Sequence, residues 1–339
     1  MSRSLLSVLP GVIVAAVVGV LSIAIAGAEE RLFGHAIIEG LVVAILLGMV
    51  VRTAWTPPEN IDVGIRFTAK QVLEAAVFLL GASVDLPLLL RAGPALALSI
   101  VLLVILGISA SFLIGRSLGL PNKLAILVAC GNGICGNSAI AAVAPVIHAE
   151  REHIASSIAF TAILGVIVVV GLPLLVRPLH LSLYQYGVLA GLTVYAVPQV
   201  LAAAFPVSAL SGQVGTLVKL VRVLMLGPVV LFFALRHRHE RHSGEEAPRF
   251  SLTRFVPWFI MGFLVLAILR SLGTLNEAAA TTARSISGWL TVAAMAALGL
   301  GVDVRAVRRV GRPVIATVSA SLTVLIVLAL TLIHGLGIR

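Results

Sequence analysis

Apolar residues form runs of about twenty along almost the whole chain, separated by short polar segments. A helix needs about twenty apolar residues to cross the bilayer core. The runs are continuous and do not alternate, which excludes the pattern of a membrane β-barrel. The pattern therefore predicts an all-α, polytopic integral membrane protein with eleven transmembrane helices, at roughly 8–28, 36–52, 70–86, 93–115, 124–148, 153–176, 184–205, 213–235, 255–272, 286–303 and 313–334.

The composition favours the same fold class. The 339 residues are 60% hydrophobic and 11% charged, with a mean hydropathy of +1.12, whereas a soluble protein carries about 25% charged residues. Because the polar segments are short, we expect a single transmembrane transporter domain over residues 1–339. Its one sizeable polar loop, 236–254, is expected in the cytoplasm.

The net charge of +10 changes the expected partners. Such a charge suggests nucleic acid for a soluble protein, but Lys and Arg mark the cytoplasmic loops of a membrane protein. With a cytoplasmic N-terminus, most of the 24 Lys and Arg residues fall in cytoplasmic segments. We therefore predict a multi-pass protein of the bacterial inner membrane, with its C-terminus outside, the lipid bilayer as a partner and no nucleic acid.

A short internal repeat bears on the topology. The segment 81–85, GASVD, resembles 299–303, GLGVD, and in the same register Arg91 matches Arg309. The two segments end the third and tenth expected spans, which cross the membrane in opposite directions. This arrangement predicts an inverted-topology repeat, which is common in secondary transporters.

The centre of the fifth span is unlike a helix interior. Glycine inside a helix costs roughly 1 kcal/mol against alanine, and Asn and Ser prefer caps. We therefore predict a broken helix at the membrane centre, with half-helices meeting at a polar segment that contains Gly131, Asn132, Gly133, Gly136, Asn137 and Ser138. Close packing through small residues is the alternative, but it does not explain two asparagines there.

A broken helix at that depth is chemically useful. The second half begins at Asn137 and Ser138, where free N–H groups and the positive end of the helix dipole favour an anion. The first half ends in free carbonyls that favour a coupling ion, Na⁺ or H⁺. Gly131, Asn132 and Gly136 complete this set of candidate substrate-binding residues.

Two other spans carry candidates for the same site. Pro198 interrupts the seventh span and is followed by the amide of Gln199. A purely structural kink is the alternative.

The eighth span holds Lys219 and Arg222 on one face. Arg222 lies about 13 Å along the helix from the start of the span, which is deep for a side chain that snorkels to the membrane surface. Uncompensated cations inside a span suggest an anionic ligand.

The remaining reactive side chains suggest no further chemistry. No nucleophile–base pair or metal-ligand spacing is present, so we expect neither an enzyme, nor a cofactor, nor a metal site. Cys130 and Cys135 are interpreted as small packing residues, and His237, His239 and His242 as part of a solvated loop. The sequence leaves the oligomeric state open, a homo-oligomer included.

Three segments, 134–142 (ICGNSAIAA), 81–85 and 219–226 (KLVRVLML), resemble the YeiH-like family of bacterial membrane proteins, whose members are described as sulfate exporters. More distantly, the GASVD segment and the broken helix are similar to the bile-acid:sodium symporter fold. That resemblance implies a core and a panel with crossed broken helices at the site.

The leading hypothesis is a secondary active transporter of a small anionic solute, sulfate or an organosulfonate, that works by alternating access at the discontinuous helix. The alternatives are cation-coupled transport of an organic carboxylate, and a membrane sensor or scaffold that does not transport.

Overall fold

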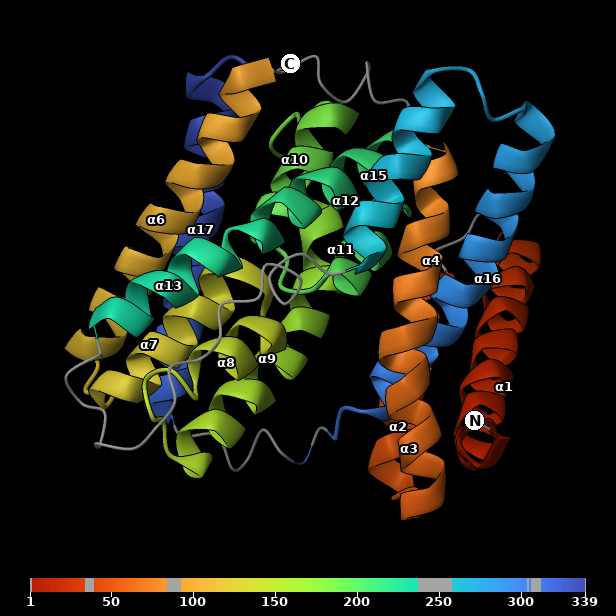
Figure 1. Cartoon of the computed structure of the whole chain (residues 1–339), viewed down its shortest axis with the longest axis horizontal. Helices are drawn as coiled ribbons and strands as arrows, with labels where there is room; N and C mark the ends of the chain where they lie inside the picture. Colours follow the sequence, from red (N-terminus) through yellow and green to blue (C-terminus); the bar gives the residue numbers. More distant parts are fainter. Residues whose placement is uncertain are drawn as a thin grey trace. The chain divides into compact units, whose positions relative to one another are not determined.

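The computed structural model describes residues 2–33, 40–83, 93–236, 258–303, 305 and 312–338, and every regular element in these ranges is a helix (Figure 1). Five helices are long and apolar enough to span a membrane: 7–29, 96–117, 209–236, 277–300 and 312–335. Shorter apolar helices accompany them. The all-α, polytopic fold is thus confirmed, whereas the count of eleven spans stays a prediction.

The helices form two compact units. The first unit, from residues 1–88 and 258–305, contains α1 (Ser2–Phe33), α2 (Gly40–Ala54), α3 (Glu59–Phe67), η1 (Thr68–Val72), α4 (Leu73–Leu80), η2 (Gly81–Ser83), α15 (Trp258–Ser271) and α16 (Glu277–Leu300). The second unit, from residues 89–257 and 306–339, contains α6 (Gly93–Ser117), α7 (Asn122–Cys130), η4 (Gly131–Cys135), α8 (Asn137–Val143), α9 (Arg151–Gly171), η5 (Leu172–Leu175), α10 (Leu183–Thr193), α11 (Val197–Ala204), α12 (Ala209–Leu224), α13 (Leu226–Arg236) and α17 (Arg312–Gly335).

Glycines bring the helices of the first unit into backbone contact. A Cβ atom on Gly299 of α16 would lie 2.2 Å from the carbonyl oxygen of Ile45 in α2, and one on Gly64 of α3 would lie 2.0 Å from the carbonyl oxygen of Val8 in α1. Lipid tails are as apolar as leucine, so helices in a membrane associate through such close packing of small residues.

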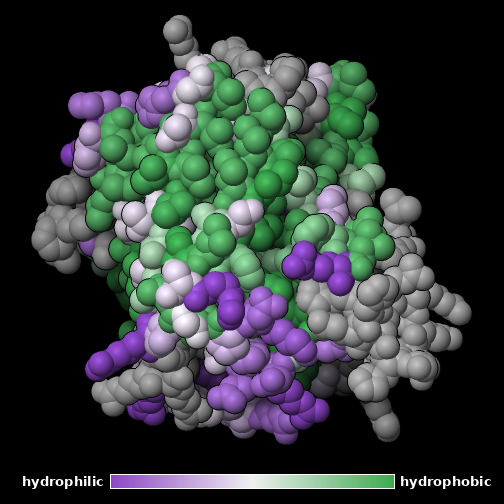
Figure 2. Space-filling model, turned by 90° about the vertical axis from the view of Figure 1, so that its left-hand side faces the viewer, coloured by the Kyte–Doolittle hydropathy of each residue, from purple (hydrophilic) through white to green (hydrophobic). Residues whose placement is uncertain are grey.

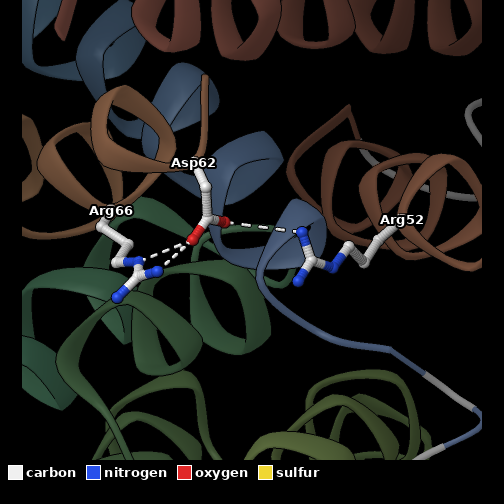
Figure 3. A network of polar contacts seen from close by, with 3 residues as sticks. All are labelled: Arg52, Asp62 and Arg66. Atoms are coloured by element: carbon white, nitrogen blue, oxygen red, sulfur yellow. Dashed lines mark hydrogen bonds and ion pairs between the residues drawn. The ribbon is translucent and has the colours of Figure 1, made fainter. Parts of the chain in front are cut away.

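The third helical segment begins earlier than the sequence pattern predicts. We expected it to start at residue 70, but α3 begins at Glu59 and continues through the π-helical turn η1 into α4. Acidic residues in the first turn favour this start because they face the positive end of the helix dipole. One of them, Asp62, accepts hydrogen bonds from Arg66 and from Arg52 at the end of α2 (Figure 3).

The inverted repeat stays a prediction. Val84, Asp85, Arg91 and Arg309, which carry part of the match, lie outside the described residues. The first glycines of the two segments share one property. Gly81 approaches the backbone of Phe263 in α15, and Gly299 approaches the backbone of Ile45 in α2.

In the second unit, α6 packs against α17 (Figure 1). Several large apolar side chains are exposed on α6, among them Leu98, Ile105 and Leu113, and Val327 is exposed on α17. Figure 2 shows a broad apolar area on one face, with hydrophilic residues gathered mainly toward its lower end. Exposed apolar surface of this kind suits contact with lipid.

The glycine contacts give a prediction with a matched control on the same helix. Replacing Gly299 with alanine should destabilise the protein by about 1–3 kcal/mol, because the new methyl group overlaps the backbone of α2. Gly288→Ala meets nothing within 4 Å and should be neutral or stabilising by up to about 1 kcal/mol. Thermal unfolding in detergent measures both; equal melting temperatures would contradict the packing argument.

Candidate functional site

The first interruption of the second unit separates α7 and η4 from α8. Lys123 at the start of α7 donates to the His148 carbonyl, just after α8, at 3.0 Å. The chain thus folds back at the interruption, and the predicted single span over 124–148 is a helical hairpin. The π-helical turn closes with a hydrogen bond of 2.8 Å from the Gly136 N–H to the Gly131 carbonyl. Gly136 itself has φ 62° and ψ −126°, a backbone conformation that residues other than glycine rarely adopt. The chain can therefore leave one helix and start another at this residue.

A second interruption separates α10 from α11. The helix α10 ends at Thr193, and Val194 to Ala196 are not helical. Pro198 lies in the first turn of α11, where its missing N–H costs nothing. The Gln199 side-chain oxygen accepts a hydrogen bond of 3.1 Å from the Ala196 N–H, so this predicted substrate ligand also caps its own helix.

The two interruptions lie against each other. A Cβ atom on Gly136 would be 3.4 Å from the Cβ atom of Tyr195. The Tyr186 hydroxyl on α10 donates a hydrogen bond of 2.7 Å to the Ala203 carbonyl on α11. Tyr186 lies near the start of α10 and Ala203 near the end of α11, so α11 folds back against α10 at the break. The prediction of one straight span over 184–205 is therefore wrong: the segment is a helical hairpin.

Small residues bring α12 close to this region. A Cβ atom on Gly187 would lie 2.8 Å from the Ser211 carbonyl oxygen, and one on Gly191 would lie 2.6 Å from the Gly215 carbonyl oxygen. The Ser211 hydroxyl also donates to the Leu183 carbonyl at 2.7 Å. Because α10 and α12 pack so closely, the residues one turn further along α12 reach the end of α10.

These next residues are Lys219 and Arg222, and both are fully buried. The Lys219 Nζ atom donates to the carbonyl oxygens of Ile134 (2.5 Å) and Val194 (2.8 Å). Each bond reaches a different interruption. The lysine therefore joins η4 to the end of α10.

Arg222 makes the same kind of connection with its wider donor group. Its Nε donates to the Gly133 carbonyl at 2.9 Å, its Nη2 to the Asn132 carbonyl at 2.7 Å and its Nη1 to the Val194 carbonyl at 3.2 Å. Helix C-termini carry free carbonyls and a partial negative charge. The two cations therefore occupy the carbonyl ends of both interruptions, and the first of these is the end that we predicted for a coupling ion.

The electrostatics of this interior are one-sided. Among the residues whose side chains are described, Lys219 and Arg222 are the only buried charged ones. Burying an ion costs several kcal/mol unless hydrogen bonds compensate it. Here backbone dipoles provide the compensation and no carboxylate does, so the region keeps its net positive charge.

The other predicted site residues lie around the first interruption. Gly131 is buried against Ile140 and Thr161. Asn132 is buried and its Nδ2 donates to the Ser111 hydroxyl of α6 at 3.2 Å. Asn137 and Ser138 are exposed in the first turn of α8. Ser111 and Thr161 were not predicted as site residues, because a single hydroxyl in an apolar span carries no distinguishing signal.

Two polar atoms near the interruptions have no hydrogen-bond partner in the part of the chain that is described. They are the Tyr195 hydroxyl and the Asn132 Oδ1 atom, on side chains with no exposed surface. Nearby, the Thr161 hydroxyl of α9 donates to the Asn137 Oδ1 atom. Buried polar groups without a partner cost about 1–3 kcal/mol each, so such groups call for a water molecule or a solute.

Comparison with known proteins defines the family. The family described as conserved hypothetical protein 698 matches residues 10–317. This chain belongs to that family. A UPF0324 membrane protein of Bradyrhizobium diazoefficiens is 51% identical over 328 residues, covering 97% of this chain and 93% of the relative. One from Brucella melitensis is 52% identical over 332 residues (98% and 92%), and one from Bacillus cereus is 35% identical over 303 residues (88% and 87%).

The family assignment agrees with the YeiH-like resemblance and with a membrane protein. The names of the relatives identify no substrate. Within the described ranges, no three His, Cys, Asp or Glu side chains are grouped as a metal site, and Cys130 and Cys135 are free thiols.

The bonds of Arg222 predict a large effect on folding. Arg222→Ala removes the bonds that it donates to the carbonyls of Asn132 and Gly133, at about 1–3 kcal/mol each, so the melting temperature should fall strongly. The melting temperature of Arg222→Lys should fall by less, because lysine keeps the positive charge, although it lacks the planar set of N–H donors of the guanidinium group. The control Arg66→Ala removes an exposed ion pair and should cost at most about 1 kcal/mol. A melting temperature of Arg222→Ala near that of the control would disprove the bracing role.

Proposed function

We propose that this chain is a secondary active transporter of a small anion, with sulfate or an organosulfonate as the candidate solute. Its place would be the bacterial inner membrane, with the N-terminus in the cytoplasm and the C-terminus outside. The second unit, which holds both interruptions, would carry the solute by alternating access.

One observation carries this proposal: two interrupted helices meet in the interior of one unit, braced by two buried cations. Discontinuous helices are costly in a membrane and recur in transporters where they bind the solute. A scaffold would have no need for them. Asn137 and Ser138 are exposed in the first turn of α8, which supports placing the entry of a polar solute at this turn.

The charge distribution supports an anion over a cation. The carbonyl ends of η4 and α10 already accept bonds from Lys219 and Arg222, so they offer few ligands to Na⁺. The N-terminal ends of α8 and α11 have the opposite polarity. With no buried carboxylate among the described side chains, a negatively charged solute would meet complementary charge on these elements.

Ligand-dependent stability provides the first test. The melting temperature of the purified protein should rise with sulfate or methanesulfonate and should be the same with and without Na⁺. A ligand at a hundredfold excess over its Kd stabilises by about 2.7 kcal/mol. A shift with acetate that requires Na⁺ would favour coupled carboxylate transport. No shift with any anion would reject the proposed solute class.

Transport itself can be tested at the first turn of α8. In proteoliposomes preloaded with sulfate, Asn137→Leu should reduce the exchange of external labelled sulfate at least tenfold, because it places an apolar side chain in the polar turn and removes the acceptor of the Thr161 hydroxyl. Asn122→Leu makes the same change in the first turn of α7, away from the interruption, and should keep wild-type exchange. Wild-type exchange in Asn137→Leu would remove this turn from the site.

A further inference from the structure

We propose that Lys219 is the proton-binding group of this protein, so that one proton travels with each anion. This inference rests on the proposed anion transport and names its coupling ion. The observation behind it is the set of hydrogen bonds that Lys219 makes in the interior of the second unit.

The Lys219 side chain can lose a proton without losing its described contacts. An ammonium group has three N–H donors, and two of these bonds are described, to the carbonyls of Ile134 and Val194. A neutral amine still has two N–H groups and can keep both bonds. Deprotonation would therefore change the charge of the site while leaving the helices braced.

Arg222 cannot take this role. A guanidinium group stays protonated in proteins, and the Nε, Nη1 and Nη2 atoms of Arg222 all donate to carbonyls. Lys219 and Arg222 share the Val194 carbonyl oxygen, so the two cationic groups are neighbours. One charge of this pair is fixed, and the other can change.

The surroundings of Lys219 offer no better proton carrier. The elements packed against α12 are α6, η4, α10, α11 and α13, and none of these described helices contains Asp, Glu or His. Their titratable and charged groups are Cys135 on η4, Tyr184 and Tyr186 on α10, and Arg116 and Arg236 at the ends of α6 and α13; Tyr195 lies in the break beside them. A carboxylate, the usual proton carrier of transporters, is thus missing from these elements.

The sign of the coupling follows from the charges. Two adjacent buried cations repel each other, and a bound anion reduces this cost. The anion therefore binds more tightly when Lys219 is protonated, and by reciprocity its binding promotes protonation. A monovalent sulfonate and one proton would cross together without net charge, whereas sulfate and one proton would carry one negative charge.

The test measures how the affinity of the full-length protein for methanesulfonate depends on pH. Methanesulfonate does not titrate in this range, so any dependence belongs to the protein. We expect the Kd to rise with pH, approaching tenfold per pH unit once Lys219 is mostly deprotonated. Calorimetry in buffers of different ionisation enthalpy should show the uptake of up to one proton per bound anion.

Variants at two lysines separate this site from other titrating groups. Lys219→Arg fixes the positive charge, so its affinity should not vary with pH and its proton uptake should vanish. Lys123→Arg makes the same change where the lysine donates to the His148 carbonyl, away from the interruptions, and should keep the wild-type slope. If Lys219→Arg does not fold, the proton uptake of the wild-type protein still decides whether a proton binds together with the anion.

The outcomes distinguish this inference from the function on which it rests. Binding of methanesulfonate that is independent of pH and takes up no proton would overturn the proton site and leave anion transport standing. The same slope in Lys219→Arg as in wild type would overturn it as well. No binding of methanesulfonate or sulfate at any pH would reject the proposed transport, and this inference with it.

Discussion

Backbone carbonyl groups at an interrupted helix need hydrogen-bond donors inside a bilayer, and the second unit is arranged around this constraint. Lys219 and Arg222 supply the donors for Asn132, Gly133, Ile134 and Val194. Each side chain spans both interruptions, so neither broken helix is stabilised separately. The charge that makes these side chains costly to bury is balanced by the carbonyl dipoles that they bind.

Small residues make this arrangement geometrically feasible. Gly187 and Gly191 let α12 approach α10 closely enough for its side chains to reach the end of that helix. Gly136 adopts a backbone conformation that larger residues resist, and this lets the first interrupted helix change direction. The same use of glycine at Gly48 and Gly299 holds the first unit together. Glycine is thus used here both for close approach and for turning.

The fold class could be predicted from the sequence because the length of an apolar run reports directly on a membrane span. The places where these helices break could also be predicted, since Gly136 and Pro198 have few roles inside a helix. The folding back of the chain at each break could not be predicted, because it depends on contacts between residues 17 and 25 positions apart. The partners of the buried cations were not. Arg222 and Asn132 lie far apart in the chain, and backbone carbonyls are the same at every residue, so no sequence pattern marks the ones that accept a bond.

The starts of two helices were predicted too late in the chain, for a related reason. The polar first turns of α3 and α16 have low hydropathy, so the pattern placed their starts later than Glu59 and Glu277. Asn276 caps α16 through a bond to the Ala279 N–H, and acidic residues open α3. Capping residues determine where these two helices begin. Hydropathy averaged over a window of residues does not detect them.

The order of the bracing groups along the chain has a consequence for biosynthesis. The acceptor carbonyls, at residues 132–134 and at Val194, are all synthesised before the donors, Lys219 and Arg222. A ribosome therefore delivers α12 to the membrane when both interrupted helices are already there. The two cations can enter the bilayer directly against waiting acceptors, and they need not be exposed to lipid. Until α12 arrives, the earlier helices lack these two donors, so the insertion of this one segment completes the bracing of both interruptions before α13 and α17 follow.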